Sequence, residues 1–150
     1  MNQQYKNVLV PVDGSKATEH LLKRAIEVAK ENNAHLDILN VLEVNQTYGG
    51  AVSGDVVFKL TENTEEQLHK MEQTARDAGL DDVDIHIRFG NPKPIIANEF
   101  PVDHNTDVIV IASTGLSAVE RIIMGSVTSF VSRNAKCDVL IVKLPKDAKK

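Results

Sequence analysis

The segment ASTGLSAVERIIMGSVT, from Ala112 to Thr128, holds the residues best suited to chemistry in this chain. Nine residues separate Gly115 from Gly125, and Ser126 follows directly. Glycine lets backbone amides approach a phosphate closely, because it has no Cβ. If a helix begins at Ser126, its first free amides also carry the positive end of the helix dipole. The segment therefore predicts a phosphate-binding loop.

Hydroxyl groups beside this loop add possible phosphate contacts. The hydroxyls of Ser126 and Thr128 can donate to phosphate oxygens, together with the backbone amides of Ser126, Val127 and Thr128. Ser126 could instead help to ligate a magnesium ion that bridges the phosphates. The structural alternative is that Gly125 is an ordinary turn and Ser126 an ordinary helix N-cap.

Residues for catalysis or metal binding form no recognisable pattern in the sequence. The histidines have no H-E-x-x-H or paired-cysteine spacing, so we expect no metal cluster of protein ligands alone, and we expect most of them at the solvated surface. They are His20, His35, His69, His86 and His104. Glu120 and Arg121 could orient water or neutralise a γ-phosphate in a slow hydrolysis, or could form the charged outer face of a turn. We expect no catalytic residues, and at most weak ATPase activity.

The elements that must position the loop alternate between apolar runs and helical patterns, which indicates linked β-α-β units and a parallel sheet. Strands are expected at residues 5–12, 34–43, 84–89, 107–112 and 138–143. Helices are expected from Ser15, as N-cap, to 32, at 61–78 with Gly79 closing the helix, from Pro92 to about 100, and at 127–134. Residues 44–60 are expected to be a long loop that could act as a lid.

These elements predict a three-layer α/β/α sandwich with a five-stranded parallel sheet of order 3-2-1-4-5. In that order the connections from strands 1 and 4 leave in opposite directions, which opens a crevice at the carboxyl ends of the two strands. Asp13, after the first strand, would face the phosphate loop across this crevice.

Composition limits the class of protein. The chain has 150 residues, of which 42% are hydrophobic and 25% charged, so we expect one domain at 1–144 and a basic, solvated tail at 145–150. The net charge of -4 and the scattered basic residues argue against a nucleic-acid partner, and no apolar tract predicts a membrane span. The beginning MNQQYKNVLV lacks the pattern of an export signal, and the single cysteine, Cys137, fits a reducing compartment. We therefore expect a cytoplasmic protein.

Two common nucleotide-binding motifs are missing, since neither G-x-x-x-x-G-K-[ST] nor G-x-G-x-x-G after the first strand occurs. Three other motifs, PVDGS at 11–15, GNP at 90–92 and the G-x9-G-S of the phosphate loop, resemble the universal stress protein family. The likeness covers nearly the whole chain. The ATP-binding branch of that family carries G-x2-G-x9-G-[ST], which matches Ala112, Gly115, Gly125 and Ser126, with alanine in place of the first glycine.

The resemblance implies an adenine nucleotide alpha hydrolase-like fold that binds ATP, with Mg²⁺ on the phosphates near Ser126 or Asp13. It also implies that Pro11, Val12 and Asp13 border the nucleotide, with Asp13 near the ribose or the metal-bound phosphates, and that the backbone of Val41 contacts adenine. Asp13 could instead be a turn residue that bonds the first helix, and Val41 could be ordinary strand core.

We therefore predict an ATP-binding regulatory or stress-response protein that acts as a nucleotide-dependent switch in a homodimer. One alternative is a slow ATP-hydrolysing or adenylating enzyme of the same superfold, although adenylating enzymes usually carry S-G-G-x-D-S where this chain has PVDGSKA. Another alternative is a ligand-independent interaction scaffold. Val139 to Val142 would form an exposed apolar edge strand, and pairing it with a second copy would make a two-fold dimer.

Overall fold

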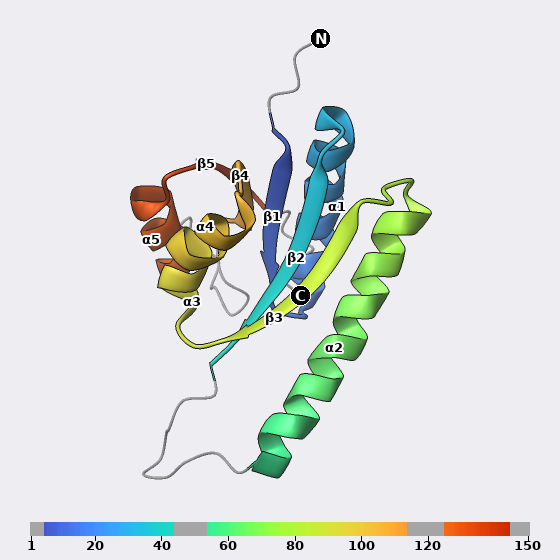
Figure 1. Cartoon of the computed structure of the whole chain (residues 1–150), viewed down its shortest axis with the longest axis vertical. Helices are drawn as coiled ribbons and strands as arrows, with labels where there is room; N and C mark the ends of the chain where they lie inside the picture. The colour runs from blue at the N-terminus through green and yellow to red at the C-terminus, as the bar shows by residue number, and fades with distance from the viewer. Residues whose placement is uncertain (1–4, 44–53, 114–124, 145–150) are drawn as a thin grey trace.

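The computed structural model describes residues 5–43, 54–113 and 125–144, which build a five-stranded parallel sheet with helices on both faces (Figure 1). The strands are β1 (Asn7–Val12), β2 (His35–Leu42), β3 (Val83–Phe89), β4 (Val108–Ala112) and β5 (Asp138–Val142). Their order is β3-β2-β1-β4-β5, which confirms the predicted topology. β1 pairs with β2 on one side and with β4 on the other, so the direction of winding reverses between β1 and β4.

The helices bury two separate apolar clusters against the sheet. α1 (Lys16–Asn32) and α2 (Gly54–Asp77) cover the face that presents Val10 and Ile38. α3 (Pro92–Pro94), α4 (Phe100–His104) and α5 (Ser126–Asn134) lie on the opposite side (Figure 1) and belong to the face that presents Leu9. Because both faces are covered, the central residues of β1 are apolar and fully buried, as expected for a parallel sheet.

The second helix is longer than the sequence pattern predicted. The expected loop over 44–60 is wrong for its last seven residues, because α2 already begins at Gly54, while residues 44–53 lie outside the described residues. This first part of α2 carries Phe58, which is 66% exposed, and only later does the helix bury Leu68 and Ala75 against the sheet. Because the large apolar side chains of the first two turns are mostly exposed, these turns have no amphipathic rhythm that could mark them as helix. Gly79 ends the helix as predicted, with φ +97.

The third helical stretch also runs past its predicted end at Phe100. α3 begins at Pro92, as predicted, with the Asn91 side chain accepting from the Lys93 amide at 3.0 Å. It continues through a π-helical stretch, η1 (Ile95–Glu99), into α4, which ends at His104. Pro101 lacks an amide hydrogen and its ring would clash with the carbonyl four residues before it, so a wider π turn directly before it lets the helix continue.

Within the described ranges, no helix is both long and apolar enough to cross a lipid bilayer. Predictions for Gly115, Glu120, Arg121 and the basic tail at 145–150 fall outside the described residues.

Candidate functional site

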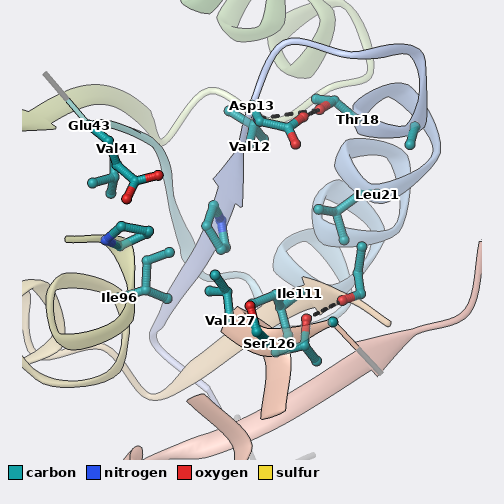
Figure 2. Close-up of a pocket in the computed structure, with 16 residues that line it drawn as sticks. Val12, Asp13, Thr18, Leu21, Val41, Glu43, Ile96, Ile111, Ser126 and Val127 are labelled. Carbon is teal, nitrogen blue, oxygen red and sulfur yellow. Dashed lines mark hydrogen bonds between the residues drawn. The ribbon is translucent and has the colours of Figure 1, made fainter. Parts of the chain in front are cut away.

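A cavity of about 310 Å³ opens at the carboxyl ends of β1, β2 and β4, where the sheet topology predicts a ligand crevice (Figure 2). Every site residue predicted from the sequence that falls within the described ranges lines this cavity. These residues are Pro11, Val12, Asp13, Val41, Ala112, Gly125, Ser126, Val127 and Thr128. Gly115 is the one predicted site residue outside those ranges. The fold thus brings the predicted residues together, and their contacts with a ligand stay predictions.

The amino terminus of α5 presents backbone amides at this cavity. Gly125 is the N-cap, with φ -61 and ψ 155, and it has no side chain that could cap the helix. The Ser129 amide donates to the Gly125 carbonyl at 2.9 Å, so the intrahelical ladder starts there. The amides of Ser126, Val127 and Thr128 precede this first bond and have no carbonyl of their own helix to bind. They lie at the positive end of the helix dipole, an arrangement that favours an anion.

Backbone hydrogen bonds join Ser113, directly after β4, to Gly125 and to Val142. The Gly125 amide donates to the Ser113 carbonyl at 2.9 Å, and the Ser113 amide donates to the Val142 carbonyl at 2.9 Å. These two bonds hold the end of β4, the start of α5 and the end of β5 as one unit. The position of the α5 amides relative to the sheet is therefore set by backbone hydrogen bonds.

Thr128 has a different role from the predicted phosphate contact through its hydroxyl. Its Oγ1 donates to the Ala112 carbonyl at 2.6 Å, and the residue is only 4% exposed. A hydroxyl has one hydrogen to donate, so this bond uses the hydrogen that was predicted to reach a phosphate oxygen. Thr128 instead fixes α5 to the end of β4, while its backbone amide remains at the amino terminus of α5.

Ala112 occupies its position without backbone strain, although it stands where the ATP-binding pattern has glycine. Among the described residues, the non-glycine residues with positive φ are Asn33 and Asn105, so Ala112 needs no conformation reserved for glycine. It lies at the end of β4 and packs against the apolar cluster beneath α1. Its methyl group is thus part of the packing of the sheet.

Asp13 is both a turn residue and a wall of the cavity. Its Oδ1 accepts from the Thr18 hydroxyl at 3.0 Å (Figure 2). It also accepts from the Ser15 amide at 3.3 Å, which confirms the turn interpretation. Ser15 is the N-cap of α1 as predicted, but its own side chain makes no capping bond. Gly14, between them, has φ +83, a conformation that other residues rarely adopt, and a Cβ there would meet Gln67.

Other lining residues were missed in the sequence. They are Ala17, Thr18, Leu21, Glu43, Pro92, Ile96 and Ile111. Glu43 directly follows β2, so its place at the carboxyl edge of the sheet could have indicated it, and Pro92 lies within the GNP motif. Ala17, Leu21 and Ile96 look like ordinary helix core residues in the sequence, and only packing places them here.

Three of the five histidines are only partly exposed and lie around one carboxylate, an arrangement that their spacing in the sequence did not predict. His35 and His86 both lie within hydrogen-bond distance of Asp37 Oδ1, at 2.8 and 2.7 Å, and the His104 ring lies 4.8 Å from that of His86. Burial alone would raise the pKa of Asp37, but its hydrogen bonds with His86 and His35 outweigh that effect and lower it. Burial alone would lower the pKa of His35, but its hydrogen bonds with Asp82 and Asp37 raise it. This cluster is separate from the cavity.

Comparison with known proteins agrees with this fold and site. Residues 4–143 match the model of the universal stress protein family. A Staphylococcus aureus (strain USA300) protein named for the same family is 42% identical over 148 residues, covering 95% of this chain and 89% of that protein. The structure of universal stress protein UspA from Lactobacillus plantarum has a TM-score of 0.77 at 26% identity and covers 94% of this chain and 99% of that one.

A universal stress protein crystallised in complex with cAMP is also similar, with a TM-score of 0.69 and 27% identity over 93% of this chain and 97% of that one. The family match, the sequence relatives and the shared sheet topology all extend over nearly the whole chain. This chain belongs to the universal stress protein family.

Proposed function

We propose that this chain binds ATP with Mg²⁺ in the cavity at the ends of β1, β2 and β4, and that it acts as a nucleotide-dependent regulatory switch. The observation that carries the proposal is the uncapped amino terminus of α5, where the amides of Ser126, Val127 and Thr128 line the cavity. The start of α1 borders the same space through Ala17 and Thr18, so two helix dipoles favour an anion there.

The rest of the cavity suits an adenine nucleoside. Val12, Val41 and Ile111 offer apolar surface for the base, and Asp13 and Glu43 offer carboxylates that can accept from ribose hydroxyls (Figure 2). The similar protein crystallised with cAMP supports an adenine nucleotide as the class of ligand. The phosphates would then extend toward Gly125 and Ser126.

The charges around the cavity indicate that ATP would bind together with magnesium. The lining residues that the structure describes include no lysine, arginine or histidine, but they include the carboxylates of Asp13 and Glu43. A triphosphate beside two carboxylates needs a cation, and Mg²⁺ prefers the oxygen ligands that phosphates, Asp13 and the Ser126 hydroxyl provide. We therefore expect ATP binding to depend strongly on Mg²⁺.

Thermal unfolding tests this proposal directly. ATP with Mg²⁺ at about ten times the Kd should stabilise the protein by about 1.4 kcal/mol, which corresponds to a rise of roughly 3–6 °C in Tm. ATP with a chelator should give a clearly smaller rise, and GTP with Mg²⁺ is the control for recognition of the base. Native mass spectrometry of the purified protein would show which nucleotide it retains. No change in Tm at millimolar ATP and Mg²⁺ would contradict the proposal.

We also propose that the chain forms a two-fold homodimer through β5. In the described part of the chain β5 pairs with β4 alone, and Val139, Leu140 and Ile141 are only half-buried. The Asp138 amide donates to the carbonyl of Asp107, directly before β4, and the Val142 carbonyl accepts from the amide of Ser113, directly after β4, so the backbone groups of residues 138, 140 and 142 face β4. Backbone groups alternate along a strand, so the amides of Val139 and Ile141 face the open edge.

Proline at position 141 tests the dimer without breaking the sheet. Ile141→Pro removes an amide hydrogen that points away from β4, so the monomer should fold while an edge-to-edge dimer loses a main-chain bond. Ile141→Ala is the matched control, because it also shortens the side chain but keeps the amide. Analytical ultracentrifugation should give monomers for Ile141→Pro and dimers for Ile141→Ala. Dimers of equal stability in both variants would place the interface elsewhere.

A further inference from the structure

Three side chains that can bind a metal converge beneath α4, away from the nucleotide cavity. Asp37 lies in β2 with its side chain only 3% exposed, and its Oδ1 is 2.7 Å from His86 Nε2. In the parallel register Asp37 pairs with Asp84 and Leu39 pairs with His86, so Asp37 and His86 point to the same face of the sheet. This is the face that Phe100 of α4 covers.

His104, the last residue of α4, completes the group. Its ring stacks on Phe100 at a centroid distance of 4.0 Å, and the His86 ring meets the edge of Phe100 at 4.9 Å. The two imidazole rings are 4.8 Å apart. One ligand atom from each of Asp37, His86 and His104 lies within 4.8 Å of the other two. Phe100 thus holds both rings close to the Asp37 carboxylate.

We propose that Asp37, His86 and His104 form a binding site for a divalent transition-metal cation, with Zn²⁺ as the best match. Two imidazoles and one carboxylate form a common ligand set for Zn²⁺. Ligand atoms about 2.1 Å from a tetrahedral ion lie about 3.4 Å from each other. Asp37 Oδ1 lies 2.7 Å from His86 Nε2, and all three ligand atoms lie within 4.8 Å of one another, so small side-chain rotations bring them to bonding distance.

Charge and access also suit a cation. Asp37 is a buried carboxylate, and its negative charge in the interior favours a divalent cation as a partner. The His86 side chain is 23% exposed, so an ion can reach the site from solvent. Three protein ligands leave one position for water or for a further ligand.

His35 belongs to the outer shell of this site. Its Nδ1 lies 2.7 Å from Asp82 Oδ1 and its Nε2 lies 2.8 Å from Asp37 Oδ1, so carboxylate oxygens engage both ring nitrogens. Because each of its ring nitrogens lies beside a carboxylate, we assign His35 to orienting the Asp37 carboxylate and not to binding the ion. Outer-shell partners of this kind commonly hold metal ligands in place.

Metal titration of the full-length, tag-free protein tests the proposal. After treatment with a chelator and dialysis, and without nucleotide, calorimetry should show one Zn²⁺ bound per chain at micromolar concentration. Co²⁺ should give the visible absorption of a tetrahedral site, and Zn²⁺ should abolish it. His104→Phe keeps an aromatic ring on Phe100 but removes a ligand, and should weaken Zn²⁺ binding about 100-fold or more, since outer-shell losses alone cost about 10–100-fold.

His69→Phe is the matched control, because His69 lies on α2, its side chain is 63% exposed, and it should bind Zn²⁺ like the wild type. Asp37→Asn, which keeps the shape of the side chain, gives a second test if His104→Phe does not fold. Wild-type protein that binds no Zn²⁺ at micromolar concentration would overturn the proposal. Unchanged Zn²⁺ affinity in the folded His104→Phe or Asp37→Asn variant would overturn it too.

Discussion

Gly125→Asp is expected to stabilise the ligand-free protein and, at the same time, to weaken its stabilisation by ATP. Gly125 is the N-cap of α5, and its φ of -61 and ψ of 155 suit any residue, so the substitution imposes no backbone strain. An aspartate at an N-cap accepts from the amides of the second or third helical residue. Here those amides belong to Val127 and Thr128, which we propose to bind phosphate.

The stability of the ligand-free protein should rise while ATP binding weakens. A misfolded variant would lose both stability and ATP binding, so the two results together exclude misfolding. Replacing glycine by aspartate at the cap should raise the free energy of unfolding by about 0.5–1 kcal/mol, from the hydrogen bond and the helix dipole. The new carboxylate both occupies the amides and repels the triphosphate. ATP affinity should therefore fall at least about tenfold, which is about 1.4 kcal/mol.

Urea unfolding without ligand and calorimetric titration with ATP and Mg²⁺ measure the two effects separately. Gly54→Asp is the control, because it makes the same substitution at the start of α2, where a Cβ meets no other atom within 4 Å. Gly54→Asp should leave ATP affinity unchanged. Gly125→Asp protein that binds ATP as tightly as the wild type would show that the α5 amides do not hold the phosphates.

Phe100→Ala is expected to lower the free energy of unfolding by about 3–5 kcal/mol. Phe100 is fully buried and is among the largest side chains of the core. Besides its apolar packing, its ring stacks on His104, meets the His86 ring edge-on, and lies under the Arg88 guanidinium with 5.0 Å between the Arg88 Cζ and the ring centroid. Removing the ring leaves a cavity between α4 and the sheet that these neighbours can fill only in part.

Phe58→Ala is the matched control for Phe100→Ala. The same atoms are removed, but Phe58 is 66% exposed on the first part of α2. Its loss should change the free energy of unfolding by no more than about 0.5 kcal/mol, as for other surface substitutions. Urea unfolding of both variants gives the comparison. If Phe100→Ala lowered the free energy of unfolding by less than about 0.5 kcal/mol, α4 would contribute little to the stability of the fold.

The local pattern of the sequence predicted those elements whose apolar residues face the sheet. The central strands β1 and β4 were found because both of their faces are covered, so nearly all of their residues are apolar. The edge strand β3 was found because its apolar and polar residues alternate. The first turns of α2 were missed because they project beyond the sheet, and there Phe58 has no buried partner to reveal a helical rhythm. The continuation of the third helix through Pro101 was missed because proline usually ends a helix, whereas a π turn accommodates it here.

The sequence by itself determined the parallel sheet, the crevice between β1 and β4, and the glycine and serine at the start of α5. These features depend on local propensities and on the few topologies that such a chain allows. Only the tertiary structure decided that the Thr128 hydroxyl binds Ala112, and that Asp37 meets His86, 49 residues away in the chain. Such contacts depend on strand register and helix packing, which join residues that no sequence spacing relates.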